Sequence, residues 1–276
     1  RNFANKIWNA SRFIMMHLEG ETIEQPDESE LVNADKWILS EFNNLVDEVT
    51  DNMEKYELGI AVSKIYDFIW DEFCDYYIEF VKPRIFNKED EKRHANAAFW
   101  TLKTVLSQSL VLLHPFMPFI TEEIYCNLLP EKESIMLASW PQYRSEWNYT
   151  DAEEKIRRTK SLIKGMRTVR AEMDVPPNKK PHIIVTSDSD HVLNIYQEVQ
   201  AMYKALGGIA SVSIQKGTEG IPGDAISVVI PDAVIYIPFE ELVDVEKERE
   251  RLLKEKERLA KELARSRGML SNENFL

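Results

Sequence analysis

The chain has 276 residues, of which 44% are hydrophobic, and a formal net charge of −13 at pH 7. This length and apolar content suffice for one large core together with a smaller satellite domain. No apolar run is long enough to span a membrane, and the N-terminus lacks the order of a signal peptide, so we expect a cytoplasmic protein that was cut from a longer one. Cys74 and Cys126 have no companion cysteine at metal spacing, which argues against a disulfide framework or a zinc knuckle.

The charge is unevenly distributed along the chain. Residues 1–20 contain three basic side chains and one acidic one, and residues 151–180 contain nine basic and five acidic ones, whereas the remainder is acidic. Binding to RNA phosphates draws on Lys and Arg. An RNA partner would therefore have to contact these two segments and selected side chains, because most of the surface would repel it.

The first half of the chain predicts long helices, because apolar residues recur there at spacings of three and four. Asn33 is the expected N-cap of the second helix. The third helix is expected to end at Lys82, because Pro83 disfavours helix in the residue before it. Long helices with short connections favour an up-and-down bundle. The predicted helices cover residues 3–18, 37–53, 58–81 and 90–113, and a short one follows Pro118 as far as Leu129.

The pattern changes after a charged helix predicted over residues 151–172. Short β-branched runs that are typical of strands follow, with one helix over residues 190–206 between the first two runs. The segment from Pro231 to Ala233 is the expected turn of a hairpin. A small α+β module is therefore predicted, with strands over residues 183–185, 212–214, 226–230 and 234–237.

From residue 240 onward the composition is almost purely Glu, Lys, Arg, Leu and Ala, with leucines in an imperfect heptad frame. This predicts the first helix of a truncated coiled-coil hairpin, whose return helix would begin at the turn-like residues 271–276. The predicted fold class is mainly α. It comprises a helical bundle over residues 1–147, a linker helix with a small α+β module over 148–239, and the coiled-coil helix over 240–276.

Motifs of a catalytic or nucleotide-binding site are absent from this sequence. The histidines are dispersed, and there is no glycine-rich phosphate loop, nucleophile elbow or paired-histidine zinc motif. Adjacent carboxylates such as Glu122 and Glu123 point in different directions on a helix, as is typical of a solvated face. We predict no catalytic residue, no metal ligand and no cofactor within this chain.

Several segments resemble one protein family. The run Lys-Ile-Trp-Asn-Ala-Ser-Arg-Phe at residues 6–13 is similar to the helix that opens the anticodon-binding domain of valyl-tRNA synthetases, a branch of the class I aminoacyl-tRNA synthetases. The runs at residues 61–70, 114–123 and 133–136 are also similar to this family. Family members continue in a small linker domain and a helical hairpin, which the second half resembles. One departure is Tyr76, where relatives commonly have tryptophan.

The resemblance implies a function for the parent protein. That protein would be a valine-tRNA ligase, which joins valine to its tRNA through a valyl-adenylate, using ATP and magnesium in a catalytic domain upstream in the same polypeptide. The family's catalytic and editing signatures are absent from these residues. This part would thus bind tRNA(Val) at the anticodon and the outer corner, as a monomer without a membrane partner. The alternatives are an isoleucyl or leucyl synthetase, or a non-enzymatic helical scaffold for protein interactions.

One stripe of the first predicted helix suits an unstacked anticodon. Asn2, Lys6, Asn9 and Phe13 recur at helical spacing beside the apolar face, and Arg12 lies next to Phe13. Amides can pair with base edges, a lysine can meet a phosphate or a base acceptor, and an aromatic ring can stack on a base. The alternative is that Phe13 belongs to the bundle core and that the cations are only solvated.

Two basic rows are weaker candidates for contacts with the tRNA backbone. Each has a plain alternative: a solvated amphipathic helix for the linker row, and ion pairs that stabilise the helix for the heptad row. The linker row contains Lys160, Lys164, Arg167 and Arg170, and the heptad row contains Arg251, Arg258 and Arg265.

Overall fold

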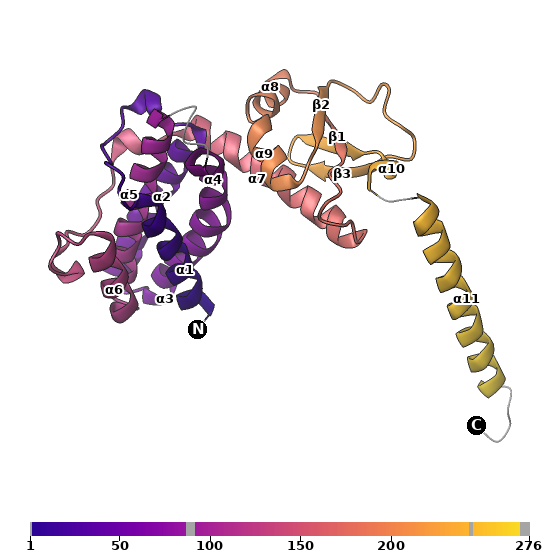
Figure 1. Ribbon diagram of the computed structural model, residues 1–276, viewed down its shortest axis with the longest axis horizontal. Helices are drawn as coiled ribbons and strands as arrows, with labels where there is room; N and C mark the ends of the chain where they lie inside the picture. Colours follow the sequence, from indigo (N-terminus) through magenta and orange to yellow (C-terminus); the bar gives the residue numbers. More distant parts are fainter. Residues whose placement is uncertain (1, 87–91, 243–244, 271–276) are drawn as a thin grey trace. The chain divides into compact units, whose positions relative to one another are not determined.

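The computed structural model describes residues 2–86, 92–242 and 245–270 (Figure 1). The chain divides into two compact units, Arg1–Arg157 and Arg158–Leu276. The prediction of a mainly α fold with one small sheet is confirmed. The finer division at residues 147 and 239 stays a prediction. Within the described ranges, no helix has both the length and the apolar character that crossing a membrane requires.

Unit 1 is a bundle of long helices, as predicted (Figure 1). Its core is built where apolar stripes meet: Ile7 and Ile14 of the first helix and Trp37, Ile38 and Phe42 of the second are at most 1% exposed. The helices are α1 (Asn2–Leu18), α2 (Asn33–Glu54), α3 (Leu58–Asp67), α4 (Ile78–Phe86), α5 (Lys92–Leu113) and α6 (Pro118–Leu128), with short 3₁₀ turns at Glu28–Glu30, Ile135–Leu137 and Ser145–Trp147.

The helix predicted over residues 58–81 is longer than expected and is not α-helical throughout. Between α3 and α4 the chain continues as a π-helical segment, η2 (Phe68–Tyr77). The prediction that Lys82 ends the helix is wrong, because α4 includes Pro83 and continues to Phe86. Tertiary anchoring accounts for the extra turn: Arg84 binds the Asp35 carboxylate through two nitrogens, both at 2.9 Å, and Ile85 is 1% exposed.

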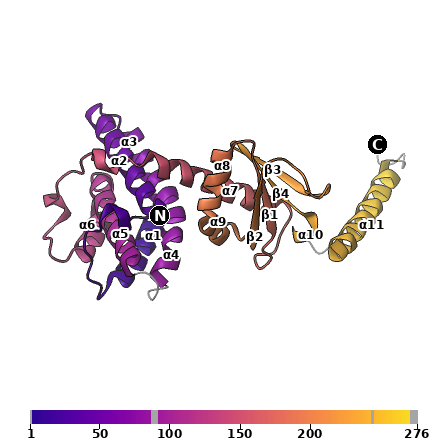
Figure 2. The ribbon, with the colours of Figure 1, turned by 90° about the horizontal axis from the view of Figure 1, so that it is seen from above.

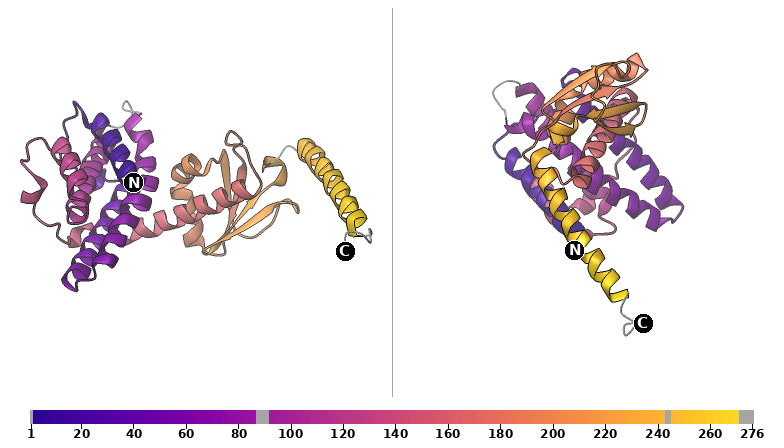
Figure 3. Two further views of the ribbon diagram at one scale, coloured as in Figure 1. Left: turned by 90° about the horizontal axis from the view of Figure 1, so that it is seen from below. Right: turned by 90° about the vertical axis from the view of Figure 1, so that its right-hand side faces the viewer.

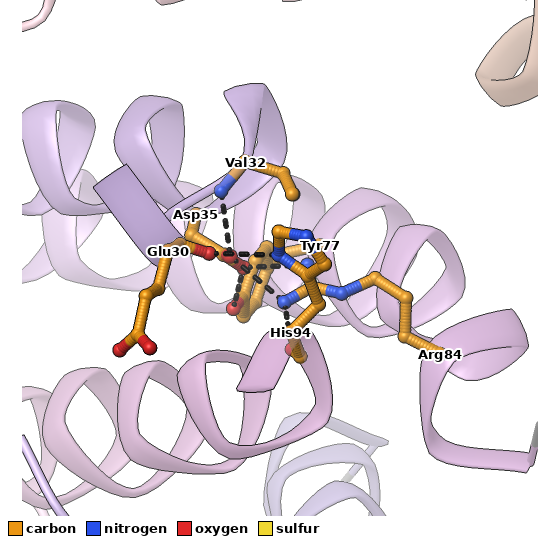
Figure 4. A network of polar contacts seen from close by, with 6 residues as sticks. All are labelled: Glu30, Val32, Asp35, Tyr77, Arg84 and His94. Carbon is orange, nitrogen blue, oxygen red and sulfur yellow. Dashed lines mark hydrogen bonds and ion pairs between the residues drawn. The ribbon is translucent and has the colours of Figure 1, made fainter. Parts of the chain in front are cut away.

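Asp35 is the centre of a buried polar network that ties α2 to α4 (Figure 4). Besides Arg84, its carboxylate accepts hydrogen bonds from the Tyr77 hydroxyl at 2.8 Å and from the Val32 backbone N–H at 3.2 Å. Burial and the neighbouring Asp35 carboxylate raise the pKa of Tyr77 well above its ordinary value. The prediction of Asn33 as N-cap is wrong: Val32 caps α2, and Asp35 binds the Val32 N–H.

Unit 2 is built on a four-stranded sheet with the strand order β2-β1-β4-β3 (Figure 2). The first two strands are parallel, and a parallel pair requires a crossover, which here consists of helices. The predicted hairpin is confirmed, since Ile230 pairs with Ala233 across a tight turn. The strands are β1 (His182–Thr186), β2 (Ser211–Gln215), β3 (Ile226–Ile230) and β4 (Ala233–Ile237), and the crossover helices are α8 (Asp190–Glu198) and α9 (Gln200–Gly207).

The crossover was predicted as one helix over residues 190–206, and this prediction is wrong, because the helix breaks at Val199. The Tyr203 hydroxyl donates a hydrogen bond of 2.8 Å to the Tyr196 carbonyl. In an uninterrupted helix that carbonyl would accept from the N–H four residues on. A buried side chain from the next turn thus replaces a backbone bond at the break.

The linker helix α7 (Thr150–Glu172) packs its second half on one face of the sheet (Figure 3). Gly165 makes a close approach possible. A Cβ atom at this position would lie 3.1 Å from a methyl group of Val228 and 3.5 Å from one of Ile235. The absence of a side chain therefore sets the distance between helix and sheet.

A short helix, α10 (Phe239–Leu242), precedes the heptad helix α11 (Val245–Leu270). The prediction of a long helix here is confirmed. Leu253, Leu259 and Leu263 are each about half exposed, at 52%, 51% and 53%. The second helix of a coiled coil stays a prediction, and its expected first turn at residues 271–276 lies outside the described residues.

Candidate nucleic-acid interface

A pocket of about 560 Å³ opens beside α1 in unit 1. All four residues of the predicted stripe line it: Asn2, Lys6, Asn9 and Phe13. The remaining lining comes from Asn5 and Ala10 of the same helix, and from Cys74, Ile78 and Lys82 of the η2–α4 helix that packs against it. The structure therefore gathers the predicted stripe around one hollow.

Lys6 is held at one side of this pocket by two groups of η2. Its ammonium nitrogen lies 2.7 Å from Oδ1 of Asp75 and 3.8 Å from the ring centroid of Trp70. The Lys6 side chain keeps 21% of its surface exposed, and that of Asp75 keeps 47%. A cation over an indole face is favourable, and a carboxylate fixes its direction.

Phe13 is half-buried, with its ring 4.4 Å from the ring of His17 and 6.5 Å from that of Phe86. The ammonium of Lys82 lies 5.7 Å from the Phe13 ring centroid and also pairs with Glu79. Phe13 is thus neither a fully buried core residue nor a free surface ring. It packs beside His17 and the exposed ring of Phe86 and also lines the pocket.

The amides of the pocket are exposed. Asn2, Asn5 and Asn9 form no side-chain hydrogen bond with any residue that the structure describes, so their donors and acceptors are available to a ligand. Arg12 is exposed on the same helix but does not line the pocket. Asn5 was missed in the sequence, although its spacing from Asn2 and Asn9 is that of one helix face.

The floor of the pocket is apolar and chemically inert. Ala10, Cys74 and Ile78 form it, and burial raises the pKa of the Cys74 thiol to about 12, against a smaller lowering by the Lys6 charge. A thiol of that pKa stays protonated at neutral pH and is a poor nucleophile. The pocket is therefore suited to binding rather than to covalent chemistry.

Two other hollows are less suited to RNA. One of about 460 Å³ in unit 1 is lined by carboxylates, among them Glu41, Asp47 and Asp71, which repel phosphate. One of about 760 Å³ in unit 2 contains Arg158, whose guanidinium is paired with Asp232 at 3.2 Å. In the described part of the chain, no group of three or more His, Cys, Asp or Glu side chains is arranged to hold a metal ion.

The basic row of the linker helix is only partly exposed. Lys164 and Arg167 are exposed, and Lys160 is half-buried. Arg170 donates hydrogen bonds to the backbone carbonyls of Lys179 at 2.8 Å and Pro176 at 2.9 Å. Arg170 thereby fastens the loop that follows α7.

The heptad row is similarly divided. Arg258 pairs with Glu255 at 2.6 Å and with Glu262 at 3.3 Å, one helical turn on each side. Arg265 is exposed and forms no ion pair with a described side chain. The side chain of Arg251 lies outside the part that the structure describes.

Comparison with known families identifies the class of protein to which this bundle belongs. Residues 35–185, more than half of the chain, match the family described as the anticodon-binding domain of tRNA ligase. The chain belongs to this family. The match includes the helices that pack against α1, although α1 itself precedes it.

Other relatives align with the whole chain, so their alignments also cover α1. The Valine--tRNA ligase of Clostridium perfringens is 45% identical over 277 residues, and that of Clostridium tetani is 46% identical. The Valine--tRNA ligase of Thermotoga maritima is 40% identical over 276 residues. Each alignment covers the whole of this chain, and the chain spans about a third of the length of these relatives.

Proposed function

We propose that this chain reads the anticodon of a tRNA with the pocket beside α1. The observation that supports the proposal most is that Asn2, Lys6, Asn9 and Phe13 line one hollow in a bundle of the anticodon-binding family. Sequence-specific RNA recognition targets unpaired bases, which stack on aromatic rings and pair with side-chain amides. The pocket offers both groups together.

The tRNA is that of valine, and the parent protein is a valine-tRNA ligase. The names of the similar proteins from both Clostridium species and from Thermotoga maritima favour valine over isoleucine or leucine. The parent protein would form valyl-adenylate from valine and ATP with magnesium in its catalytic domain and transfer valine to the tRNA. It would work in the cytoplasm as a monomer.

We propose contacts between the tRNA backbone and basic residues of α7 and α11 as a secondary part of binding. Lys164 of α7 and Arg265 of α11 are exposed cations that could follow phosphates, and Arg167 is exposed on the turn after Lys164. Arg170 and Arg258 contribute less, because they are bound to carbonyls and carboxylates of the chain itself. The outer corner of the tRNA is the expected target of α11.

The decisive measurement is binding of a valine tRNA anticodon stem-loop to the chain and to Phe13→Ala. Loss of one base stack weakens binding by about 1 to 3 kcal/mol. Phe119→Ala is the matched control, because Phe119 is an aromatic residue of the same unit that is 90% exposed and does not line the pocket. Equal affinities of both variants, with intact circular dichroism, would contradict the proposed pocket.

A further inference from the structure

Lys6 differs from Arg12, the other Lys or Arg residue of α1, in how little conformational freedom its side chain retains. A lysine carries three N–H donors on a flexible stem, and most surface lysines sample many rotamers. Here Asp75 takes one donor at 2.7 Å, and the Trp70 ring covers a second side at 3.8 Å. The Lys6 side chain also lines the pocket.

The π-helical geometry of η2 makes this double contact possible. Trp70 and Asp75 are five residues apart, which in an α-helix separates two side chains by about 140° around the axis. In a π-helix the backbone hydrogen bonds join i and i+5, so residues five apart lie on the same face, as residues four apart do in an α-helix. Both therefore face Lys6 from the same side of the segment.

The pocket is also balanced in charge. Lys6 is paired with Asp75, and Lys82 is paired with Glu79, one helical turn further along. Neither cation can therefore act as an uncompensated attractor for phosphate. Arg12, by contrast, is exposed and has no ion-pair partner among the described residues.

We infer that Asp75 and Trp70 are positioning residues, which turn Lys6 into a reader of an acceptor atom on an anticodon base, while Arg12 contacts a phosphate. This inference rests on the proposed function of the pocket. Neither positioning residue belongs to α1. Their role follows from the contacts with Lys6.

A fixed, neutralised lysine discriminates between bases by a simple mechanism. When RNA binds, the Lys6 ammonium loses a water molecule, and a base with an acceptor atom at that place restores the lost hydrogen bond. A base with a donor there leaves the ammonium desolvated and repelled, and a buried polar group without a partner is costly. A mobile lysine could bind a phosphate instead, and a mismatched base would then no longer leave the ammonium desolvated.

The test uses the 276-residue chain with a valine tRNA anticodon stem-loop and with stem-loops that carry single substitutions in the anticodon. Dissociation constants are measured over a series of salt concentrations. Asp75→Asn frees the Lys6 charge, so discrimination between matched and substituted stem-loops should fall at least about tenfold. The salt slope should steepen by about 0.7, the value of one extra phosphate contact on a single strand.

Matched variants separate the roles of the individual groups. Asp51→Asn releases Lys55 from an exposed ion pair of 2.5 Å elsewhere in unit 1 and should change neither quantity. Asp75→Glu keeps the charge and should preserve discrimination. Lys6→Ala should lower discrimination at least as much as Asp75→Asn and leave the slope unchanged, whereas Arg12→Ala should flatten the slope by about 0.7 and leave discrimination unchanged.

Trp70 gives a second, independent test in case Asp75→Asn does not fold. Trp70→Leu removes the aromatic face and should lower discrimination, and Trp70→Phe should retain most of it. The inference is overturned if Lys6→Ala lowers discrimination while Asp75→Asn and Trp70→Leu both preserve it. If the unmodified chain binds all stem-loops equally, the proposed function fails as well, and that outcome is distinct.

Discussion

At the scale of single residues, Asp35 carries a charge that is fully enclosed by the bundle. Its carboxylate faces four donors, from Val32, Tyr77 and both terminal nitrogens of Arg84. A buried ion pair of this kind contributes little net stability compared with apolar residues of similar volume. Removing only one partner of such a pair strongly destabilises a protein, because the remaining buried group loses the interaction that offset its desolvation.

We expect Asp35→Ala to lower the free energy of unfolding of unit 1 by about 3 to 5 kcal/mol, because Tyr77, Val32 and Arg84 would all lose the buried carboxylate that they share. Urea denaturation followed by tryptophan fluorescence measures this, since all six tryptophans of the chain lie within residues 8–147. Asp51→Ala, which breaks an exposed pair, should leave the midpoint unchanged. Equal midpoints for both variants would show that the network contributes nothing beyond a surface pair.

Part of the candidate site could be predicted from the sequence, and the rest could not. The stripe on α1 is visible because residues of one helix face follow from helical periodicity alone. The partners of Lys6 are not, because Asp75 is 69 positions away and its proximity depends on how two helices pack. Lys82 was likewise missed, since it was expected to lie at a helix end and not beside Phe13.

At the scale of secondary-structure elements, local patterns predicted α1, α2, α7 and the four strands well, because periodicity and β-branching are local signals. The breaks were harder to predict. α4 passes through Pro83 because Arg84 is anchored to Asp35, and the crossover breaks at Val199 where Tyr203 binds a carbonyl. Both exceptions arise from tertiary contacts that override local preference.

Gly165 is the element-scale feature whose change we expect to matter most in unit 2. Gly165→Val would push α7 away from Val228 and Ile235, and overpacking of this kind costs about 1 to 3 kcal/mol. Hydrogen exchange of the β1 and β4 amides reports the loss. Gly59→Val is the control, because a Cβ atom there meets no atom within 4 Å. Unchanged exchange in Gly165→Val would mean that the helix–sheet distance is not set by this residue.

At the scale of the whole molecule, a net charge of −13 and a charge-balanced pocket limit how RNA can be held. Non-specific binding depends almost entirely on neutralising phosphates. A protein that repels RNA over most of its surface must gain its affinity from stacking and hydrogen bonds. Such contacts depend on the identity of the base, so they favour specific binding over high affinity for RNA in general.

We therefore expect a shallow salt dependence for the complete chain. The logarithm of the association constant for a valine tRNA should fall with the logarithm of salt concentration at a slope of about −2 to −3, the value expected if Arg12, Lys164 and Arg265 each contact one phosphate. Filter binding between 50 and about 300 mM salt measures the slope, and a random single strand of equal length is the control. A slope near −10 would mean that general electrostatics dominates after all.

The π-helical segment η2 has a consequence for how this protein can change over generations. Because its wider turns accommodate extra residues between two α-helical ends, losing one residue could let the helix revert to regular α geometry with its hydrophobic core intact. A deletion elsewhere in η2 would leave Trp70 and Asp75 five residues apart in an α-helix and would turn Asp75 away from Lys6, whereas a deletion between them would leave them four apart on one face. Among descendants that keep the same reading pocket, loss of the π-helical segment should therefore go together with loss of one residue between Trp70 and Asp75.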